Sequence, residues 1–332
     1  MRIVVFGATG NVGTAVVRAL LTDSSITSIV GVARRLPDPG DPPDDPRLSW
    51  HAADVATDPL DVVEGADAVV HLAWLIQPSH DETAMRGTNV IGSTRVARAV
   101  AAHGVPALVV ASSVGTYAEH TKQGRADESW PATGIESSTY SRHKAQVEMM
   151  LDEFEVEHPE VRVVRMRTSL VFQRSAASQV HRLFLGRLLP WNLPRPLRLV
   201  PNLPTLRFQA SHADDIADAY ARVTLQPVRG AFNVAAEPVL DPTLIADAVG
   251  GRTIPMARWP LRLAASVSYR LHIQPSEAGW LDMATGTPVM DTGRIRTEVG
   301  WSPRHSSIDA LTELLGGIGD RADGPSPPLR RE

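Results

Sequence analysis

The fold is decided at the start of the chain by the stretch Arg2-Ile3-Val4-Val5-Phe6-Gly7-Ala8-Thr9-Gly10-Asn11-Val12-Gly13. Its first five residues have strand character, and apolar residues from Val12 to Leu20 then recur at helical spacing. Between a strand and a helix, glycines allow a tight turn and let the backbone approach a pyrophosphate at the positive helix N-terminus. We therefore predict a dinucleotide-binding turn, although glycine can also serve the geometry of a strand–helix turn alone. The predicted binding residues are Gly7, Thr9, Gly10, Asn11, Val12 and Gly13.

The end of the second predicted strand, Ile29–Ala33, indicates which dinucleotide would bind. An acidic residue at this position accepts hydrogen bonds from the ribose 2′-hydroxyl of NAD. This chain has Arg34 and Arg35 instead, and its first acid, Asp38, comes after a proline. Arginine can bind a 2′-phosphate bidentately. We therefore predict that NADP(H) is favoured over NAD(H), although both arginines could be solvated loop charges.

Strand-like and helix-like segments alternate along the first half of the chain. Further strands are predicted at Trp50–Val55, Asp67–Trp74, Ala107–Ala111 and Val161–Val171, and a helix at Met85–His103. This alternation is typical of βαβ units and predicts an α/β fold with a doubly wound parallel sheet. Ligands of such sheets bind beyond the carboxyl ends of the strands. Gly7, Arg34, Ala73 and Ser113 all follow predicted strands, so we expect them at one site.

Tyr140 and Lys144 lie four residues apart, which places both side chains on one face if the segment is helical. A tyrosine has an unperturbed pKa of about 10, so it is a poor acid–base group at neutral pH. A neighbouring ammonium favours the phenolate and lowers that pKa. The pair is therefore a candidate for exchanging a proton with an alcohol or ketone. Taken alone it is a weak signal, because such a pair more often belongs to a solvated helix face.

Length and composition restrict the class of protein. The chain has 332 residues and is 43% hydrophobic, enough for one large domain or for a large domain with a small one. Its formal net charge of −4 gives no reason to expect nucleic acid or an anionic membrane as a partner. The absence of cysteine excludes disulfides and cysteine-based zinc sites, and we predict no metal site. The short N-terminal apolar run does not suit a signal peptide and no run is long enough for a membrane span, so we expect a cytoplasmic protein.

Further motifs carry a resemblance to a known family. They are Asp54-Val55, His71-Leu72-Ala73, Asn89 with Gly92, Ser112-Ser113 with Tyr117, His212-Ala213-Asp214-Asp215, Phe232-Asn233-Val234 and Gly300-Trp301-Ser302-Pro303. With the glycine turn and the Tyr140–Lys144 pair, they make the chain resemble an extended short-chain dehydrogenase/reductase of the NAD(P)-dependent epimerase/dehydratase type. The resemblance covers about residues 1–315. It implies a Rossmann-type sheet with a smaller, mostly helical C-terminal substrate lobe.

The resemblance implies catalytic roles for four residues. Ser113 would hold the substrate oxygen, and Tyr140 would be the acid–base group. Lys144 would bind the nicotinamide ribose and depress the pKa of the tyrosine. Asn89 would support a proton relay.

The resemblance also implies cofactor contacts beyond the glycine turn. They are Asp54 and Val55 at the adenine, Leu72 and Ala73 along the cofactor channel, and Tyr140 and Lys144 at the nicotinamide end. Proteins of this family often form homodimers through a four-helix bundle, here built from the helices at about 85–103 and 140–158. We therefore expect a homodimer that acts on a small-molecule substrate.

The domain organisation follows the same outline. We predict a dinucleotide-binding domain in residues 1–172 with 207–236 returning to it, and a substrate lobe in residues 173–206 and 237–316. Leu183–Leu206 is rich in leucine, proline and arginine and contains Trp191. It is either a lid over an apolar substrate or a loop packed on its own domain. Residues 317–332 have glycines, prolines and charge without aromatics, and are predicted to be a disordered tail.

The predicted activity is NAD(P)(H)-dependent hydride transfer at a carbonyl or secondary alcohol of a fairly apolar small molecule, with tyrosine acid–base catalysis. In the sugar 4,6-dehydratases of the family, Asp-Glu follows the active-site hydroxyl residue, whereas Val114-Gly115 follows Ser113 here, so dehydration is disfavoured. The run Arg207–Asp215 matches the pattern of nucleotide-sugar epimerases only in part. A nucleotide-sugar epimerase with tightly bound NAD is the alternative prediction. A non-catalytic, NADP-sensing binding protein on the same fold is a lesser one.

Overall fold

The computed structural model describes residues 1–41, 43–76, 80–181, 198–272 and 276–330. In this part of the chain a seven-stranded parallel sheet forms the centre, with the strand order β10-β6-β5-β4-β1-β2-β3. Its strands are β1 (Arg2–Phe6), β2 (Ser28–Ala33), β3 (Leu48–Ala52), β4 (Ala68–His71), β5 (Ala107–Ser113), β6 (Arg162–Thr168) and β10 (Gly230–Val234). The chain order reverses between β1 and β4, which is where such sheets bind ligands.

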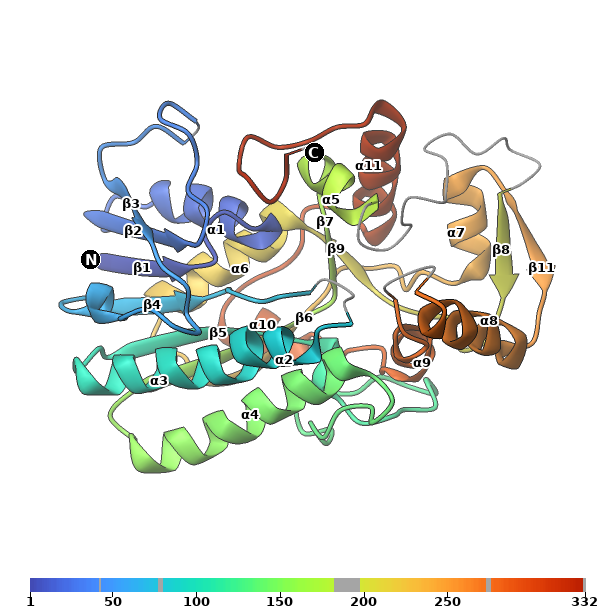
Figure 1. Cartoon of the computed structure of the whole chain (residues 1–332), viewed down its shortest axis with the longest axis horizontal. Helices are drawn as coiled ribbons and strands as arrows, with labels where there is room; N and C mark the ends of the chain where they lie inside the picture. Colours follow the sequence, from blue (N-terminus) through green and yellow to red (C-terminus); the bar gives the residue numbers. More distant parts are fainter. Residues whose placement is uncertain (42, 77–79, 182–197, 273–275, 331–332) are drawn as a thin grey trace.

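Helices cover both faces of this sheet (Figure 1). On one face, α1 (Asn11–Leu21) and α6 (Ala213–Leu225) pack on each other over a core that includes Phe232 and Trp301. On the other face, α3 (Ser93–Ala102) and α4 (Thr139–Glu157) pack over a second core that includes Leu108, Leu151 and Phe154. Strands buried on both faces account for the continuous apolar runs of β1, β4 and β5. The predicted α/β class and doubly wound parallel sheet are confirmed.

The C-terminal half beyond β6 is mainly helical, as predicted, with short strands added. Its helices are η4 (Arg174–Ala176), α5 (Ala177–Val180), α7 (Pro242–Val249), α8 (Arg258–Arg270), α9 (Gly279–Gly286), α10 (Gly293–Glu298) and α11 (Ser307–Asp320). Its strands form two small parallel pairs, β7 (Leu170–Phe172) with β9 (Ala210–His212), and β8 (Leu199–Asn202) with β11 (Arg252–Pro255). The remaining short 3-10 helices are η1 (Asp61–Val63) and η3 (Val114–Thr116).

Several strand predictions differ from the structure in their bounds. The strand predicted at Asp67–Trp74 is β4, which ends at His71, and the strand predicted at Ala107–Ala111 is β5, which continues to Ser113. The strand predicted at Trp50–Val55 is β3, which ends at Ala52 because the Asp54 carboxylate accepts a hydrogen bond from Ala56 N and so closes a turn. The strand predicted at Val161–Val171 is two strands. The chain leaves the central sheet at Ser169, and β7 then pairs with β9 instead.

The helix predicted at Met85–His103 is interrupted. It consists of α2 (Glu82–Arg86), a π-helical segment η2 (Gly87–Gly92) and α3. Within it the Ser93 and Thr94 hydroxyls donate to the carbonyls of Asn89 and Val90, which offers those carbonyls an alternative to regular helical hydrogen bonds. Short π-helical segments often mark functional sites, and this one contains Asn89.

Residues 317–330 differ from the disorder predicted for 317–332, of which residues 331–332 lie outside the described residues. Helix α11 continues to Asp320, and residues 321–330 pack against the body of the protein with Leu329 only 1% exposed. A single apolar anchor in a segment of glycine, proline and charge is difficult to recognise from composition. Residues 183–197 of the predicted lid lie outside the described residues. None of the helices in the described ranges combines the length and apolar character that crossing a membrane needs.

Candidate active site

The glycine turn after β1 has the form that a bound pyrophosphate requires. Gly7 has φ +78°, and a Cβ there would lie 2.6 Å from the Ala73 nitrogen. A Cβ at Gly13 would lie 2.1 Å from the Gly7 oxygen. Gly10 caps α1 without a side-chain hydrogen bond, so no cap side chain occupies the N–H groups of the first helical turn. Close packing without side chains and a positive helix terminus together suit an anion.

Nine of the predicted cofactor residues line one pocket beyond the carboxyl ends of the strands. They are Gly7, Thr9, Gly10, Arg34, Arg35, Asp54, Val55, Leu72 and Ala73. The other predicted cofactor residues, Asn11, Val12, Gly13, Tyr140 and Lys144, do not line this pocket. Asn11 and Val12 instead support the turn. The Asn11 amide donates to Val171 O at 2.9 Å, and Val12 packs against the core beneath α1. The pocket, the close-packed glycine turn and the two adjacent arginines Arg34 and Arg35 fit a nicotinamide dinucleotide.

Arg34 lies at the end of β2 as predicted, with an acid opposite it. Its Nη1 is 3.8 Å from Asp54 Oδ2 at the end of β3, and the Arg34 side chain is half exposed. Arg35 is exposed beside it on the pocket wall. The pocket wall after β2 therefore carries two guanidinium groups.

Ser113 and Tyr140 come together from two elements. Ser113 ends β5, and Tyr140 stands in the first turn of α4, which the Ser138 hydroxyl caps by accepting from Ser141 N at 3.3 Å. A Cβ at Gly115 would lie 2.8 Å from Tyr140 Cε1, so the turn after β5 packs directly on the phenol ring. Burial of the hydroxyl raises the pKa of Tyr140 to about 12, while a hydrogen bond with Ser113 lowers it. The phenol is thus protonated at neutral pH, in contact with the predicted substrate-holding serine.

Lys144 is buried one helical turn after Tyr140. Its Nζ donates to Ala111 O at 2.7 Å and lies 3.4 Å from the centre of the Trp74 ring. Burial lowers the pKa of Lys144 to about 7, although the nearby Glu148 carboxylate raises it. A ribose hydroxyl would reach this ammonium only if the Trp74 indole moved. Lys144 Nζ lies 5.8 Å from the centre of the Tyr140 ring, and burial raises the pKa of Tyr140, which differs from the depression that the resemblance implies.

We expect Lys144 to titrate near pH 7 in the cofactor-free protein. Its pKa in the folded protein lies below the ordinary 10.5, so between about pH 7 and 10.5 the lysine is protonated in the unfolded chain but neutral in the folded one. In that pH range its contribution makes the free energy of unfolding rise with pH. Lys144 and Lys122 are the only lysines in the sequence, so selective 13C-lysine labelling gives two signals that Lys144→Met assigns. A midpoint above about pH 9.5 for the assigned signal, close to the ordinary lysine value, would contradict the burial argument.

Asn89 makes different contacts from those of a proton relay. Its side-chain oxygen accepts from Leu75 N at 2.7 Å and its amide donates to Leu75 O at 3.0 Å. Asn89 therefore holds the loop after β4, which carries Trp74 into the pocket. Its predicted support of a proton relay stays a prediction.

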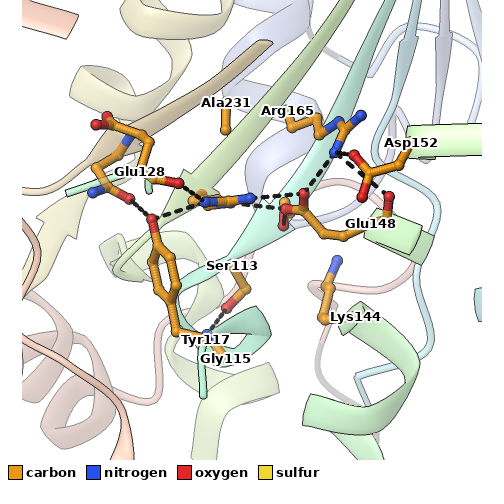
Figure 2. A network of polar contacts seen from close by, with 12 residues as sticks. Ser113, Gly115, Tyr117, Glu128, Lys144, Glu148, Asp152, Arg165 and Ala231 are labelled. Carbon is orange, nitrogen blue, oxygen red and sulfur yellow. Dashed lines mark hydrogen bonds and ion pairs between the residues drawn. The ribbon is translucent and has the colours of Figure 1, made fainter. Parts of the chain in front are cut away.

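A buried charge network lies beneath the site (Figure 2). Glu148, one turn after Lys144, accepts from the Ser112 hydroxyl at 2.5 Å and from Arg167 Nε and Nη2, each at 3.0 Å. Arg165 Nη1 adds an ion pair at 3.3 Å. Burial raises the pKa of Glu148, but hydrogen bonds from Arg167 and Ser112 and the arginine charges outweigh this effect and lower it overall. The network fixes α4 against β5 and β6, and so positions Tyr140 and Lys144.

Comparison with known proteins identifies the family. The model of the NAD dependent epimerase/dehydratase family matches residues 3–235. The chain belongs to this family. The prediction of an enzyme of the extended short-chain dehydrogenase/reductase type is thereby confirmed at the level of the family.

Solved epimerase/dehydratase structures share the fold. MoeE5 in complex with UDP-glucuronic acid and NAD has a TM-score of 0.69 and 19% identity, over 97% of this chain and 100% of that one. The dTDP-glucose 4,6-dehydratase DesIV from Streptomyces venezuelae has a TM-score of 0.69 and 20% identity, over 96% and 97% of the two chains. UDP-glucuronic acid 4-epimerase from Bacillus cereus has a TM-score of 0.69 and 16% identity, over 97% and 99%.

Curated relatives match a smaller part of the chain. The uncharacterized protein Rv0501 of Mycobacterium tuberculosis (strain ATCC 25618 / H37Rv) is 23% identical over 164 residues, which make up 48% of this chain and 40% of that protein. The uncharacterized protein Mb0513 of Mycobacterium bovis (strain ATCC BAA-935 / AF2122/97) matches to the same extent. The matched region therefore spans less than half the length of these relatives.

Several residues at this epimerase/dehydratase site were not predicted from the sequence. Trp74, Gln179 and Pro328 line the cofactor pocket, and Trp280 packs on Tyr140 with ring centres 5.3 Å apart. A signal existed for Trp74, which directly follows the predicted Ala73, and for Glu148, which continues the four-residue spacing of Tyr140 and Lys144. Pro328 and Trp280 reach the site only through tertiary contacts, and nothing in their local sequence indicates it.

Proposed function

We propose that the protein is an NAD(P)(H)-dependent oxidoreductase that reduces a carbonyl, or oxidises a secondary alcohol, of a fairly apolar small molecule. The observation that carries the proposal is that the turn after Ser113 packs directly on the Tyr140 ring, with Lys144 one helical turn further. The Tyr140 and Lys144 side chains both contact Trp74, which lines the neighbouring pocket. A phenol and an ammonium in this arrangement suit proton exchange with an alcohol or ketone. The retention of both groups disfavours a non-catalytic sensing protein.

The roles of the side chains follow from their protonation and contacts. When bound, the nicotinamide cofactor supplies or takes up the hydride. Ser113 and Tyr140 hydrogen-bond the carbonyl oxygen, and Tyr140 donates its proton to that oxygen during reduction. A phenol whose pKa is about 12 is held in the donating form at neutral pH. In its protonated form, which is about half populated at pH 7, Lys144 supplies positive charge that favours the phenolate left after proton transfer.

Aromatic side chains around Tyr140 support an apolar substrate. Trp74 meets the phenol ring edge-on at 5.8 Å and Trp280 lies tilted against it at 5.3 Å. Met283 lies near Gly115 on the same side, within 3.1 Å of where a Cβ of that glycine would stand. The Trp74 indole nitrogen is buried without a hydrogen-bond partner among the described residues, so it is available to a polar group of a ligand. Ligand sites of this kind combine apolar walls with few polar groups.

The turn after Ser113 supports the prediction that dehydration is disfavoured. Dehydratases of the family place an acidic pair where this chain has Val114-Gly115. Because a Cβ at Gly115 would come within 2.8 Å of the Tyr140 ring, a glutamate there would displace the phenol. The nucleotide-sugar epimerase remains the second candidate, since MoeE5, which has a similar fold at 19–20% identity, is solved with NAD and either UDP-glucuronic acid or UDP-glucose.

We expect NADP(H) to bind more tightly than NAD(H), because Arg34 and Arg35 face the ribose end of the pocket. Hydrogen bonds to a charged group contribute about 1.5–3 kcal/mol, so Arg34→Asp should weaken NADPH binding roughly ten- to a hundredfold and leave NADH binding nearly unchanged. Calorimetric titration of both cofactors measures this. Equal affinities in the wild type, unaltered by the substitution, would remove the basis for the preference.

We expect Trp280→Ala to raise the KM of aryl ketones roughly tenfold, because burial of a large aromatic group is worth more than 1.4 kcal/mol. The dissociation constant of NADPH should stay the same, since Trp280 does not line the cofactor pocket. Trp259→Ala is the matched control, because Trp259 is 69% exposed on α8. Equal KM values for Trp280→Ala and the wild type would argue against an aromatic wall.

We also propose a homodimer through α3 and α4, with the cytoplasm as its setting. Large apolar side chains stay exposed on α4 and on η2, which precedes α3, with Ile91 44%, Met149 58% and Val156 82% exposed. Met149 and Val156 are seven residues apart and share one face of α4. Light scattering during size-exclusion chromatography tests the assembly, and Val156→Glu should shift it toward a monomer.

The experiment that tests the proposed function is a substrate screen. Aryl and aliphatic ketones are compared with UDP- and dTDP-sugars, and NADPH consumption and sugar epimerisation are both measured. The proposal predicts ketone-dependent NADPH consumption. Epimerisation of a sugar nucleotide without added cofactor, together with inertness toward every ketone, would establish the second candidate instead.

A further inference from the structure

The C-terminal segment, residues 321–330, returns from α11 toward the N-terminal half of the sheet (Figure 1). Ser178 of α5 anchors its beginning, since both the Ser178 nitrogen and hydroxyl donate to Ala322 O, at 3.1 and 2.7 Å. Leu329 anchors its end. This side chain is 1% exposed and packs against Gly324, where a Cβ would lie 3.0 Å from Leu329 Cβ. The segment is thus a packed part of the protein.

Between these anchors the C-terminal segment contacts the dinucleotide turn itself. The buried Ser326 hydroxyl donates to Thr9 O at 2.8 Å, inside the glycine turn. Pro328 lines the same pocket as Gly7, Gly10 and the two arginines at its ribose end. The segment therefore forms a wall of the cofactor pocket, together with Gln179 of α5.

Arg330 connects the C-terminal segment to the loop after β2. Its guanidinium pairs with Asp38 and Asp41, each at 2.5 Å. These carboxylates follow Arg34 and Arg35 directly in the loop that borders the ribose end of the pocket. Unpaired, they would repel a 2′-phosphate. Paired with Arg330, their charge is offset, so they oppose a 2′-phosphate beside Arg34 and Arg35 less strongly.

We propose that the C-terminal segment is a binding element of the cofactor site, which closes its adenosine end, slows cofactor release and, through Arg330, favours a 2′-phosphorylated dinucleotide. The segment contacts the site by a hydrogen bond, a pocket-lining proline and an ion pair, so a bound dinucleotide leaves this end only after the segment moves. The inference rests on the proposed binding of a nicotinamide dinucleotide at the glycine turn.

Release rates test the proposal without any substrate. Tryptophan-to-NADPH energy transfer in a stopped-flow displacement experiment gives the dissociation rate constants of NADPH, and fluorescence of the reduced ring gives those of NADH. A chain ending at Gly324 should release NADPH roughly tenfold faster than the wild type. Arg330→Ala should accelerate the release of NADPH more than that of NADH. Arg296→Ala, on an exposed site of α10, is the matched control and should leave both rates unchanged.

Two further variants keep the test decisive if the truncated chain does not fold. Ser326→Ala removes only the hydrogen bond to Thr9. Asp38→Arg combined with Arg330→Asp reverses the ion pair between these two residues. This double variant should therefore recover part of the slow cofactor release that the single variant Arg330→Asp loses. Release rates within about twofold of the wild type in every folded variant would overturn the proposal. Failure of the wild type to bind either cofactor would overturn both this proposal and the proposed function. A wild type that binds cofactor, with unchanged release rates in the variants, would overturn this proposal alone.

Discussion

Tyr140→Phe is expected to lower kcat by about 10²–10⁴-fold, the usual contribution of a positioned acid–base group. The substitution removes only the hydroxyl that contacts Ser113 and leaves the ring packed against Gly115, Trp74 and Trp280. The dissociation constant of NADPH should therefore change by less than about twofold. Steady-state rates with the best ketone of the screen, together with calorimetric titration of NADPH, measure both quantities.

Two comparisons make the Tyr140→Phe result specific. Tyr269→Phe, on α8, should keep the wild-type rate. Lys144→Ala should impair both turnover and cofactor binding, because Lys144 is expected to serve the ribose as well as the tyrosine. If Tyr140→Phe kept more than about a hundredth of the wild-type rate, the phenol would not be the acid–base group.

Glu148→Gln is expected to reduce the free energy of unfolding by roughly 3–5 kcal/mol, the cost of breaking a buried ion pair on one side. The Glu148 carboxylate is 2% exposed and is bound to Ser112, Arg165 and Arg167. Glutamine keeps the shape but removes the carboxylate that pairs with the buried Arg167 guanidinium, whereas Arg165 keeps its ion pairs with Asp152 and Glu155. Asp152→Asn is the matched control, since Asp152 also pairs with Arg165 but is 68% exposed, and it should cost less than about 1 kcal/mol.

The pH dependence of stability gives a second test of Glu148. The pKa of Glu148 is lowered from the ordinary 4.5. Its contribution to the free energy of unfolding is therefore present above pH 4.5 and is lost as the pH falls through the pKa of the folded protein. Wild-type stability should therefore fall more steeply below about pH 4.5 than that of Glu148→Gln. Urea denaturation at a series of pH values measures both curves. Parallel curves would show that the stabilisation by Glu148 does not come from its negative charge.

The parts of the fold that were predictable are those with a local pattern. The glycine turn, the strand ends at Arg34 and Ser113, and the Tyr140–Lys144 pair each depend on spacing within a short stretch. The parallel sheet then brings these ends together, because every one of its strands points the same way.

The parts that were not predictable depend on contacts between distant segments. Arg165 and Arg167 on β6 look like ordinary alternating residues until α4 places Glu148 between them. Trp280 reaches Tyr140 from the C-terminal region, and Ser326 reaches Thr9 from the far end of the chain. Composition suggested disorder for that end, because one buried leucine and three polar contacts carry little weight in a segment of glycine, proline and charge.

Deuterium transfer from the nicotinamide ring to the product is the most direct test of the proposed hydride transfer with Tyr140 as proton donor. NADPH labelled at either face of C4 is incubated with a ketone substrate, and the alcohol is analysed by mass spectrometry. The proposed chemistry predicts one deuterium at the carbinol carbon from one of the two labelled cofactors with the wild-type protein, and less than about a hundredth of that product with Tyr140→Phe. Alcohol formed without deuterium from either label, or equal yields from the wild type and Tyr140→Phe, would contradict it.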